Sequence, residues 1–167
     1  MKLHNKKGLA RLKFPAGNLG GFTLIELLVV IAIIGILSTL AVVSLGSARI
    51  RARDSKRVAD MRSLQSALEV FYTDRGTYPV LATAGNIEEM YLCNTAGVTA
   101  FSPSPCAPPA NQLMRVAKDP VAAQVYTYTS ATGTTYSVAF TLEQAVGELA
   151  LGTNCLTPGG MASGACP

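Results

Sequence analysis

The feature that most limits the fold of this chain is a run of 22 residues without a charged side chain, from Leu27 to Ala48. As a helix this run would be about 33 Å long, enough to cross the roughly 30 Å hydrocarbon core of a bilayer. The whole chain is 49% hydrophobic and only 14% charged. One apolar segment attached to an ordinary domain explains that composition.

Positive charge is concentrated before the apolar run. The first 21 residues hold five cations and no acid: Lys2, Lys6, Lys7, Arg11 and Lys13. The remaining residues carry nine Lys and Arg against 10 Asp and Glu, a net charge of −1. The basic character therefore belongs to the N-terminus, and DNA, although kept as a partner to consider, has no electrostatic support in the rest of the chain.

Residues 1–21 are predicted to be a basic leader that is removed. An ordinary secretory signal has its small-residue cleavage site after the apolar stretch. Here the small residues Gly20 and Gly21 come before it. Cleavage at this position would leave the apolar segment, residues 22–48, at the new N-terminus as a transmembrane or filament-core helix.

The helical pattern continues beyond the apolar run. Apolar side chains recur at spacings of three and four, as on one face of an amphipathic helix: Val58, Met61, Leu64, Leu68 and Phe71. Gly76 and Pro79 are typical helix terminators. The sequence predicts one helix from about Thr23 to Asp74, with residues 49–76 as its amphipathic continuation. Proline is absent from Leu37 to Thr73, which predicts a helix without a proline kink.

Residues 77–167 are predicted to form a globular head, so the fold class is α+β, a long hydrophobic helix packed on a small antiparallel sheet. Residues 77–123 are expected to be a loop, because 102–109 is dense in proline. Strands are predicted over 124–129 and 134–142, joined by a turn at 130–133, with a third at 148–151. Residues 152–167, rich in Gly and small residues, are expected to be a disulfide-rich loop.

Four cysteines follow the apolar run, which favours disulfides in an oxidising compartment. They are Cys93, Cys106, Cys155 and Cys166. Of the three pairings, we favour Cys93 with Cys106 and Cys155 with Cys166, because each would close a turn-rich loop. The alternative is a zinc site, but the chain has no Cys-x-x-Cys pair and its one histidine is His4.

The segment around the proposed cleavage site, Gly21-Phe22-Thr23-Leu24-Ile25-Glu26 followed by the apolar run, resembles the N-terminal methylation motif of type IV pilins and pseudopilins. The resemblance implies a lollipop-shaped pilin fold. It also implies that a membrane-embedded aspartyl peptidase cuts after Gly21 and methylates the new amino group of Phe22. Glu26 would be the residue that guides filament assembly.

Physical chemistry supports this role for Glu26. A lone carboxylate in an apolar helix costs several kcal/mol unless it is paired, roughly 2–4 on membrane insertion scales. Cleavage would create a cation, the amine of Phe22, that the Glu26 of a neighbouring helix could meet on assembly. In the alternative interpretation, Glu26 is only an acid in the first helical turn, favoured there by the helix dipole.

A second group of cations follows the apolar run: Arg49, Arg51, Arg53, Lys56 and Arg57. The simple interpretation is a solvated helix face; the alternatives are contact with anionic lipid, with acidic patches of neighbouring subunits, or with DNA. This group nearly balances the leader in the positive-inside rule. The acid-free leader, the cysteines and the motif favour a head outside the cytoplasm.

Two short elements of the head also resemble pseudopilins, namely Gly76-Thr77-Tyr78-Pro79 and Lys118-Asp119-Pro120. Secretion pseudopilins bind calcium in their C-terminal loop, but this chain has no Asp or Glu after Glu148. No metal or cofactor is therefore expected. Glu143 and Glu148 are expected to be solvated, and no catalytic motif supports an enzyme.

The sequence thus predicts a structural subunit of a type IV pilus-like filament, held in the inner membrane as a precursor and later in a cell-surface fibre. The resemblance implies as partners other copies of the chain, the prepilin peptidase and methyltransferase, an inner-membrane assembly platform with its ATPase motor, and lipid before assembly. One alternative is a pseudopilin of a type II secretion or competence system. Another is a single-span, membrane-anchored binding protein that does not polymerise.

Overall fold

The structure is a computed structural model that describes residues 21–94, 100–108 and 111–167. The predicted leader, apart from Gly21, lies outside the described residues. The chain divides into two compact units, one ending at Val42 and the other comprising Val43–Pro167. The second unit contains all the strands.

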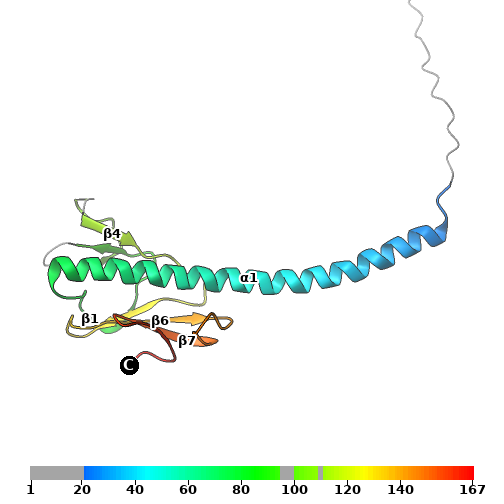
Figure 1. The fold of residues 1–167 in the computed structure, drawn as a ribbon. Coiled ribbons are helices and arrows are strands. Elements are labelled where there is room, and N and C mark those ends of the chain that lie inside the picture. The colour runs from blue at the N-terminus through cyan, green and yellow to red at the C-terminus, as the bar shows by residue number, and fades with distance from the viewer. Residues whose placement is uncertain (1–20, 95–99, 109–110) are drawn as a thin grey trace, which may run out of the picture. The chain divides into compact units, whose positions relative to one another are not determined.

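A single helix, α1, comprises Leu24–Arg75 and agrees with the predicted helix to within one residue at each end. It ends where the sequence predicts, because Gly76 adopts a positive φ of 72° and its N–H donates to the carbonyl of Tyr72 at 2.7 Å. This left-handed residue just past the last turn is a common helix C-cap. The helix is continuous through the proline-free stretch (Figure 1).

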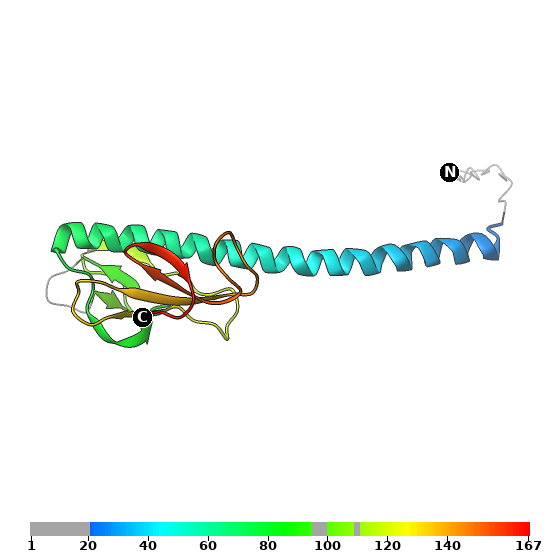
Figure 2. The ribbon, with the colours of Figure 1, turned by 60° about the horizontal axis from the view of Figure 1, so that its bottom comes forward.

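Five antiparallel strands form the larger sheet, in the order β1-β5-β6-β7-β8. Their bounds are Leu81–Asn86, Thr127–Ser130, Ser137–Leu142, Gly152–Thr157 and Gly160–Ser163. Burial alternates along β6, where Val138, Phe140 and Leu142 are buried and the residues between them are partly buried. Figure 2 shows this sheet beside the C-terminal half of α1.

The hairpin predicted over 124–142 forms, but its strands are shorter. Gln124 belongs to a turn, because its N–H donates to the carbonyl of Val121 at 2.9 Å. At the other end the loop is wider than predicted, and Ser130 Oγ donates across it to the carbonyl of Thr135 at 2.6 Å. Gly133 is required here: it has φ of 76°, and a Cβ would lie 3.0 Å from the carbonyl oxygen of Tyr78.

The expectation for the C-terminal residues was wrong. Residues 152–167, expected to be a loop, contain the hairpin β7–β8. The third strand predicted over 148–151 is replaced by an isolated bridge between Val146 and Leu149. Glycines and small residues concealed the hairpin, whose centre is nevertheless buried at Asn154, Cys155 and Leu156.

The segment 77–123 was expected to be irregular but contributes β1 and a second sheet. This smaller sheet has the order β3-β2-β4, with strands Phe101–Ser102, Tyr91–Cys93 and Gln112–Arg115. All its pairings are antiparallel. The prolines confine these strands to two to four residues.

The core forms where the predicted apolar face of α1 meets the two sheets. Val58, Met61, Leu64, Leu68 and Phe71 are all buried, so the predicted stripe is confirmed. Aromatic rings continue the core at the end of the helix: Tyr78 packs edge-on against Tyr136, with ring centroids 4.7 Å apart. Burial raises the pKa of Tyr78 to about 12.

Candidate functional site

The first turn of α1 is closed by reciprocal hydrogen bonds between Thr23 and Glu26. The backbone N–H and the hydroxyl of Thr23 donate to Oε2 of Glu26 at 2.9 and 2.7 Å. The N–H of Glu26 donates to Oγ1 of Thr23 at 3.3 Å. This arrangement is a capping box, with Thr23 as N-cap. Oε1 of Glu26 accepts no hydrogen bond from the described residues.

The side chains that follow the capping box are turned outward. Every residue from Gly21 to Gly46 is exposed, including Phe22 with 78% of its surface accessible. By length and composition, α1 contains a segment able to cross a membrane. The structure thus places an exposed apolar helix directly after the proposed cleavage site. The roles of Gly21 in cleavage, Phe22 in methylation and Glu26 in assembly remain predictions.

A buried ion cluster joins α1 to the head. Arg57, which has no accessible surface, donates from Nε and Nη2 to the two carboxylate oxygens of Asp119 at 2.7 and 2.8 Å. Its Nη1 donates to Asp54 at 2.7 Å and to Glu143 at 2.8 Å. These hydrogen bonds, led by that to Asp119, outweigh burial and raise the pKa of Arg57. We call Asp54, Arg57, Asp119 and Glu143 the Arg57 clamp.

The clamp also holds backbone groups of the head. Asp54 accepts the N–H groups of Glu143 and Gln144 at 3.0 and 2.8 Å. Asp119 accepts the N–H of Val121 at 2.7 Å. The carboxylates are therefore satisfied by both charge and hydrogen bonds, as buried ions must be. The loop before β5 and the end of β6 are fixed to the same two turns of α1.

The clamp corrects the expectation that the cations after the apolar run form a solvated face. Arg57 is buried, and Arg53 donates from Nε to Glu143 at 2.8 Å. Glu143, expected to be solvated, is held by Arg53 first and by Arg57 second, which lower its pKa to about 2. Only Arg49, Arg51 and Lys56 of this group are exposed.

Part of this site could have been found from the sequence. Thr23-x-x-Glu26 matches the capping-box pattern, and Asp54 and Arg57 are three apart, a spacing that brings helical side chains together. The remaining partners could not have been found, since Asp119 and Glu143 follow Arg57 by 62 and 86 residues.

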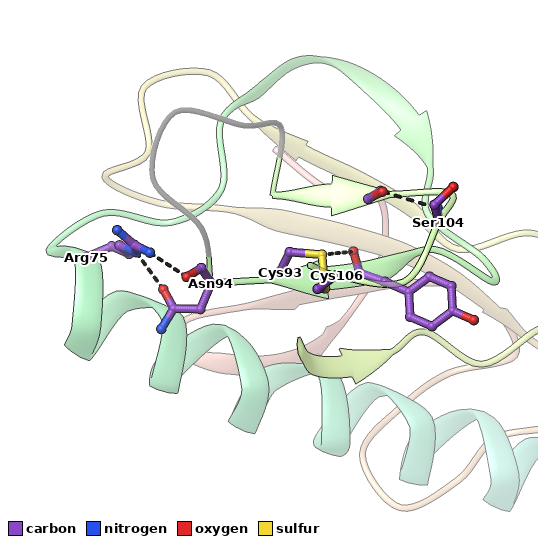
Figure 3. The surroundings of a disulfide bond; sticks show 7 residues. Arg75, Cys93, Asn94, Ser104 and Cys106 are labelled. Carbon is purple, nitrogen blue, oxygen red and sulfur yellow. Dashed lines mark hydrogen bonds between the residues drawn. A yellow bond between two sulfur atoms is a disulfide. The ribbon is translucent and has the colours of Figure 1, made fainter. Parts of the chain in front are cut away.

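Two disulfides fasten the head, in the pairing that the sequence favours. Cys93 in β2 is bonded to Cys106, and Cys155 in β7 to Cys166, with Cα atoms 5.6 and 5.1 Å apart. Figure 3 shows the first of them beside Asn94, which accepts hydrogen bonds from Arg75 at the end of α1. No cysteine is free, so the zinc alternative is wrong.

The described residues contain no group of three or more His, Cys, Asp or Glu side chains that could hold a metal ion. A hollow of about 490 Å³ lies between α1 and β4. Its lining has no titratable side chain: Ser63, Ser66, Ala67, Val70, Leu113 and Met114. It lacks the groups that acid–base catalysis requires.

Together, these features define a class of protein: an α+β head clamped to one long helix whose exposed N-terminal half begins with a capping box shortly after the predicted cleavage site. Residues 18–42 match the family model described as the prokaryotic N-terminal methylation motif. The chain therefore carries a prepilin N-terminus.

Individual relatives agree with this assignment. The type II secretion system core protein G of Pectobacterium carotovorum subsp. carotovorum is 44% identical over 59 residues, 35% of this chain and 38% of the relative. The core protein G of Escherichia coli (strain K12) is 42% identical over 35% of this chain and 41% of its own length. The type IV major pilin protein PilA of Myxococcus xanthus (strain DK1622) is 36% identical over 35% of this chain and 26% of its own length.

The chain spans about two fifths or less of the length of each of these relatives. No solved structure matches it significantly. The relationship therefore rests on a shared segment of about 59 residues and on the motif.

Proposed function

We propose that this chain is the precursor of a structural subunit of a type IV pilus-like filament. It is cleaved after Gly21, methylated at the amine of Phe22, and polymerised through the apolar half of α1. The observation that carries this proposal is Glu26, which closes the capping box and is the single acid of the N-terminal half of α1, where the apolar side chains are exposed on all sides.

Glu26 can serve the helix and the filament together. Its Oε2 accepts both hydrogen bonds from Thr23, so the cap does not occupy the whole carboxylate. Its Oε1 is left for the Phe22 amine of a neighbouring copy. Pairing these charges between subunits would offset the cost of placing an isolated carboxylate in an apolar environment, so it would favour one register of the helices.

The apolar half of α1 needs cover that the described residues do not give. In the precursor that cover is the lipid of the inner membrane, with the head outside the cytoplasm; in the filament it is the helices of other copies. Lipid is as apolar as a helix bundle, so burial alone does not drive extraction. We therefore include an assembly platform with an ATPase motor, and the prepilin peptidase and methyltransferase, among the partners.

Mass spectrometry of the mature chain tests the processing. The expected N-terminus is Phe22 carrying one methyl group, with Cys93 linked to Cys106 and Cys155 to Cys166. A mature chain that begins at another residue would contradict the proposed cleavage.

Glu26→Ala tests the assembly role. We expect cleavage to proceed and filaments to be lost, as measured by immunoblotting of the processed chain and electron microscopy of sheared fibres. Thr23→Val is the matched control, because it removes the capping hydroxyl and keeps the acid. We expect this control to assemble; if it fails as Glu26→Ala does, the acid acts through the cap and the proposed pairing is wrong.

A second candidate is a major pseudopilin of a type II secretion or competence system. The names of the core protein G relatives and the Gly76–Pro79 element favour it. The absence of any acid after Glu148 and the two disulfides argue against it. Long extracellular fibres labelled for this subunit would support the pilus; secretion or DNA uptake that depends on the chain without such fibres would support the pseudopilin.

A membrane-anchored binding protein that stays monomeric is the candidate of another class. Cysteine crosslinking between copies, with single cysteines placed at exposed positions such as Ile34 and Val42, distinguishes it. A ladder of crosslinked species would exclude it, and crosslinks confined to background would favour it.

A further inference from the structure

Two arginines at the end of the apolar run are unused by the fold. Of the five cations from Arg49 to Arg57, the structure pairs Arg53 and Arg57 with acids. Arg49 and Arg51 are exposed and have no ion pair with any described residue. The fold therefore neutralises the cations nearer the head and leaves these two with their full charge.

The two arginines lie at a definite depth along α1. With a rise of about 1.5 Å per residue, Arg49 and Arg51 lie roughly 1.5 and 4.5 Å beyond Ala48. The headgroup region on each side of a bilayer is roughly 5–7 Å thick. If the uncharged run fills the hydrocarbon core, both guanidinium-bearing residues lie within the phosphate layer.

Lys56 is not placed in the same way. It lies about 12 Å beyond Ala48 along the helix, outside the headgroup layer. Its Nζ donates to the carbonyl oxygen of Lys118 at 3.5 Å, so it is directed toward the head. It provides a cation of the same group that should not contact lipid.

The angular positions of the two arginines suit a helix that crosses this layer. Successive helical residues are about 100° apart, so Arg49 and Arg51 point to nearly opposite sides. A helix lying in the membrane surface would have its cations on one polar face. Cations on opposite sides can instead contact headgroups all around a crossing helix.

The base of the head lies at the same level. Ser47 and Ile50 are partly buried, and with Asp54 and Arg57 they continue, at spacings of three and four, the face of α1 that is turned toward the head. The part of α1 covered by the head therefore begins next to Arg49 and Arg51.

We propose that Arg49 and Arg51 bind the phosphate groups of anionic phospholipids in the leaflet next to the head. The contacts hold the unassembled subunit at a fixed depth in the membrane and are broken when it is extracted. This proposal rests on the membrane-inserted precursor stage of the proposed function.

The test uses the full-length precursor reconstituted in phosphatidylcholine vesicles that contain phosphatidylglycerol. The chain has no tryptophan, so Ala48→Trp introduces a single reporter beside the arginines. Its fluorescence is quenched with phosphatidylglycerol or phosphatidylcholine brominated on the acyl chains, at equal mole fraction. Each cation near an anionic surface contributes about five-fold in affinity, so we expect a selectivity of several-fold for phosphatidylglycerol.

Charge-matched variants in the reporter background identify the groups responsible. Arg49→Gln with Arg51→Gln should bring the selectivity close to one. Lys56→Gln with Arg62→Gln, which removes the same charge from exposed positions further along α1, should leave it within two-fold. An equal fall in the selectivity for phosphatidylglycerol in both double variants would mean that net charge alone attracts the lipid. That result would overturn the proposal.

The remaining outcomes also decide between interpretations. A reporter quenched equally by both bromolipids shows insertion without lipid selection and overturns the inference alone. Quenching by neither lipid shows that the chain does not insert, and contradicts the membrane stage of the proposed function as well. If Arg49→Gln with Arg51→Gln abolishes filaments but leaves lipid selectivity unchanged, the arginines contact acidic groups of a neighbouring subunit instead.

Discussion

The two halves of α1 belong to one continuous helix but differ in how their apolar side chains are covered. In the first half Leu37 keeps 60% of its surface accessible, whereas in the second half Leu64 has none accessible. The second half has one apolar face, which its own head covers. The first half is apolar on all sides, and the described part of the chain covers none of it. Helix formation is shared by both halves, but only the second half has a face that described residues bury.

This difference indicates which part of α1 determines the free energy of unfolding of the head. Unfolding of the head should depend on residues of the second half and be insensitive to the first, while assembly should depend on the first half. Four sets of substitutions test that division, in order of the expected effect on the free energy of unfolding. Each is measured on the full chain in detergent, by denaturant unfolding followed through near-ultraviolet circular dichroism.

The largest loss is expected for Arg57→Met. It removes the cation that neutralises Asp54 and Asp119 and leaves both buried carboxylates without a cationic partner, which typically costs about 3–5 kcal/mol. Arg62→Met, at an exposed position of the same helix, is the control and should change stability by less than about 0.5 kcal/mol. A loss below about 1 kcal/mol for Arg57→Met would mean that the clamp contributes little.

The same substitution in the two halves sharpens the comparison directly. Leu64→Ala should cost about 2–5 kcal/mol, because it leaves a cavity in the core. Leu37→Ala should leave the unfolding of the head unchanged within about 0.5 kcal/mol while weakening filaments, scored by fibre yield. Equal losses of stability at the two positions would contradict the division of α1.

Removal of either disulfide should have a somewhat smaller effect. The paired cysteines are 13 and 11 residues apart, so loop-closure entropy predicts about 3 kcal/mol for each. Cys93→Ala with Cys106→Ala, and Cys155→Ala with Cys166→Ala, should therefore destabilise the head by similar amounts. The reduced wild-type protein provides the control, since it should unfold more easily than either double variant.

Glu143→Gln is expected to have the smallest effect, about 1 kcal/mol for a partly solvated ion pair. Because the folded pKa of Glu143, about 2, is below its ordinary 4.5, the carboxylate stabilises the fold above pH 4.5. That stabilisation is lost as the pH falls from about 4.5 to 2. The difference in stability between wild type and Glu143→Gln should thus be constant near neutral pH and shrink toward zero near pH 2. A difference independent of pH would exclude the ion pair as its source.

The sequence predicts the elements that are encoded locally. The helix, its end at Gly76 and the buried face from Val58 to Phe71 follow from periodicity and from terminating residues, and the structure confirms them. The hairpin around Gly133 is also predicted, although Gln124 and Ser130 change roles at its ends. These features depend on neighbours within a few residues, which a single sequence displays.

The rest depends on partners that are distant in the sequence. Cys93 of β2 pairs with Gln112 of β4 across a proline-rich segment. No local sequence pattern predicts that register. The hairpin β7–β8 has a glycine-rich composition typical of a loop, but Leu156 is buried once it pairs with Val138 of β6. In the sequence, Arg57 cannot be told apart from the exposed cations beside it. It is buried because Asp119 and Glu143 contact it in the fold. Tertiary contacts override local propensity at each of these positions.

The position of the Arg57 clamp has a mechanical consequence. If a motor extracts the subunit from the bilayer by its head, as the proposed function requires, the force would reach the apolar half of α1 through the contacts that join the helix to the head. Counted from the apolar run, the charged contacts of α1 with the head begin at Arg53, Asp54 and Arg57. Short charge-assisted bonds, loaded together in shear, resist such traction better than a sliding apolar contact does. The Arg57 clamp would thus transmit force from the head to α1. If the clamp were weakened, the head would separate from the helix under force.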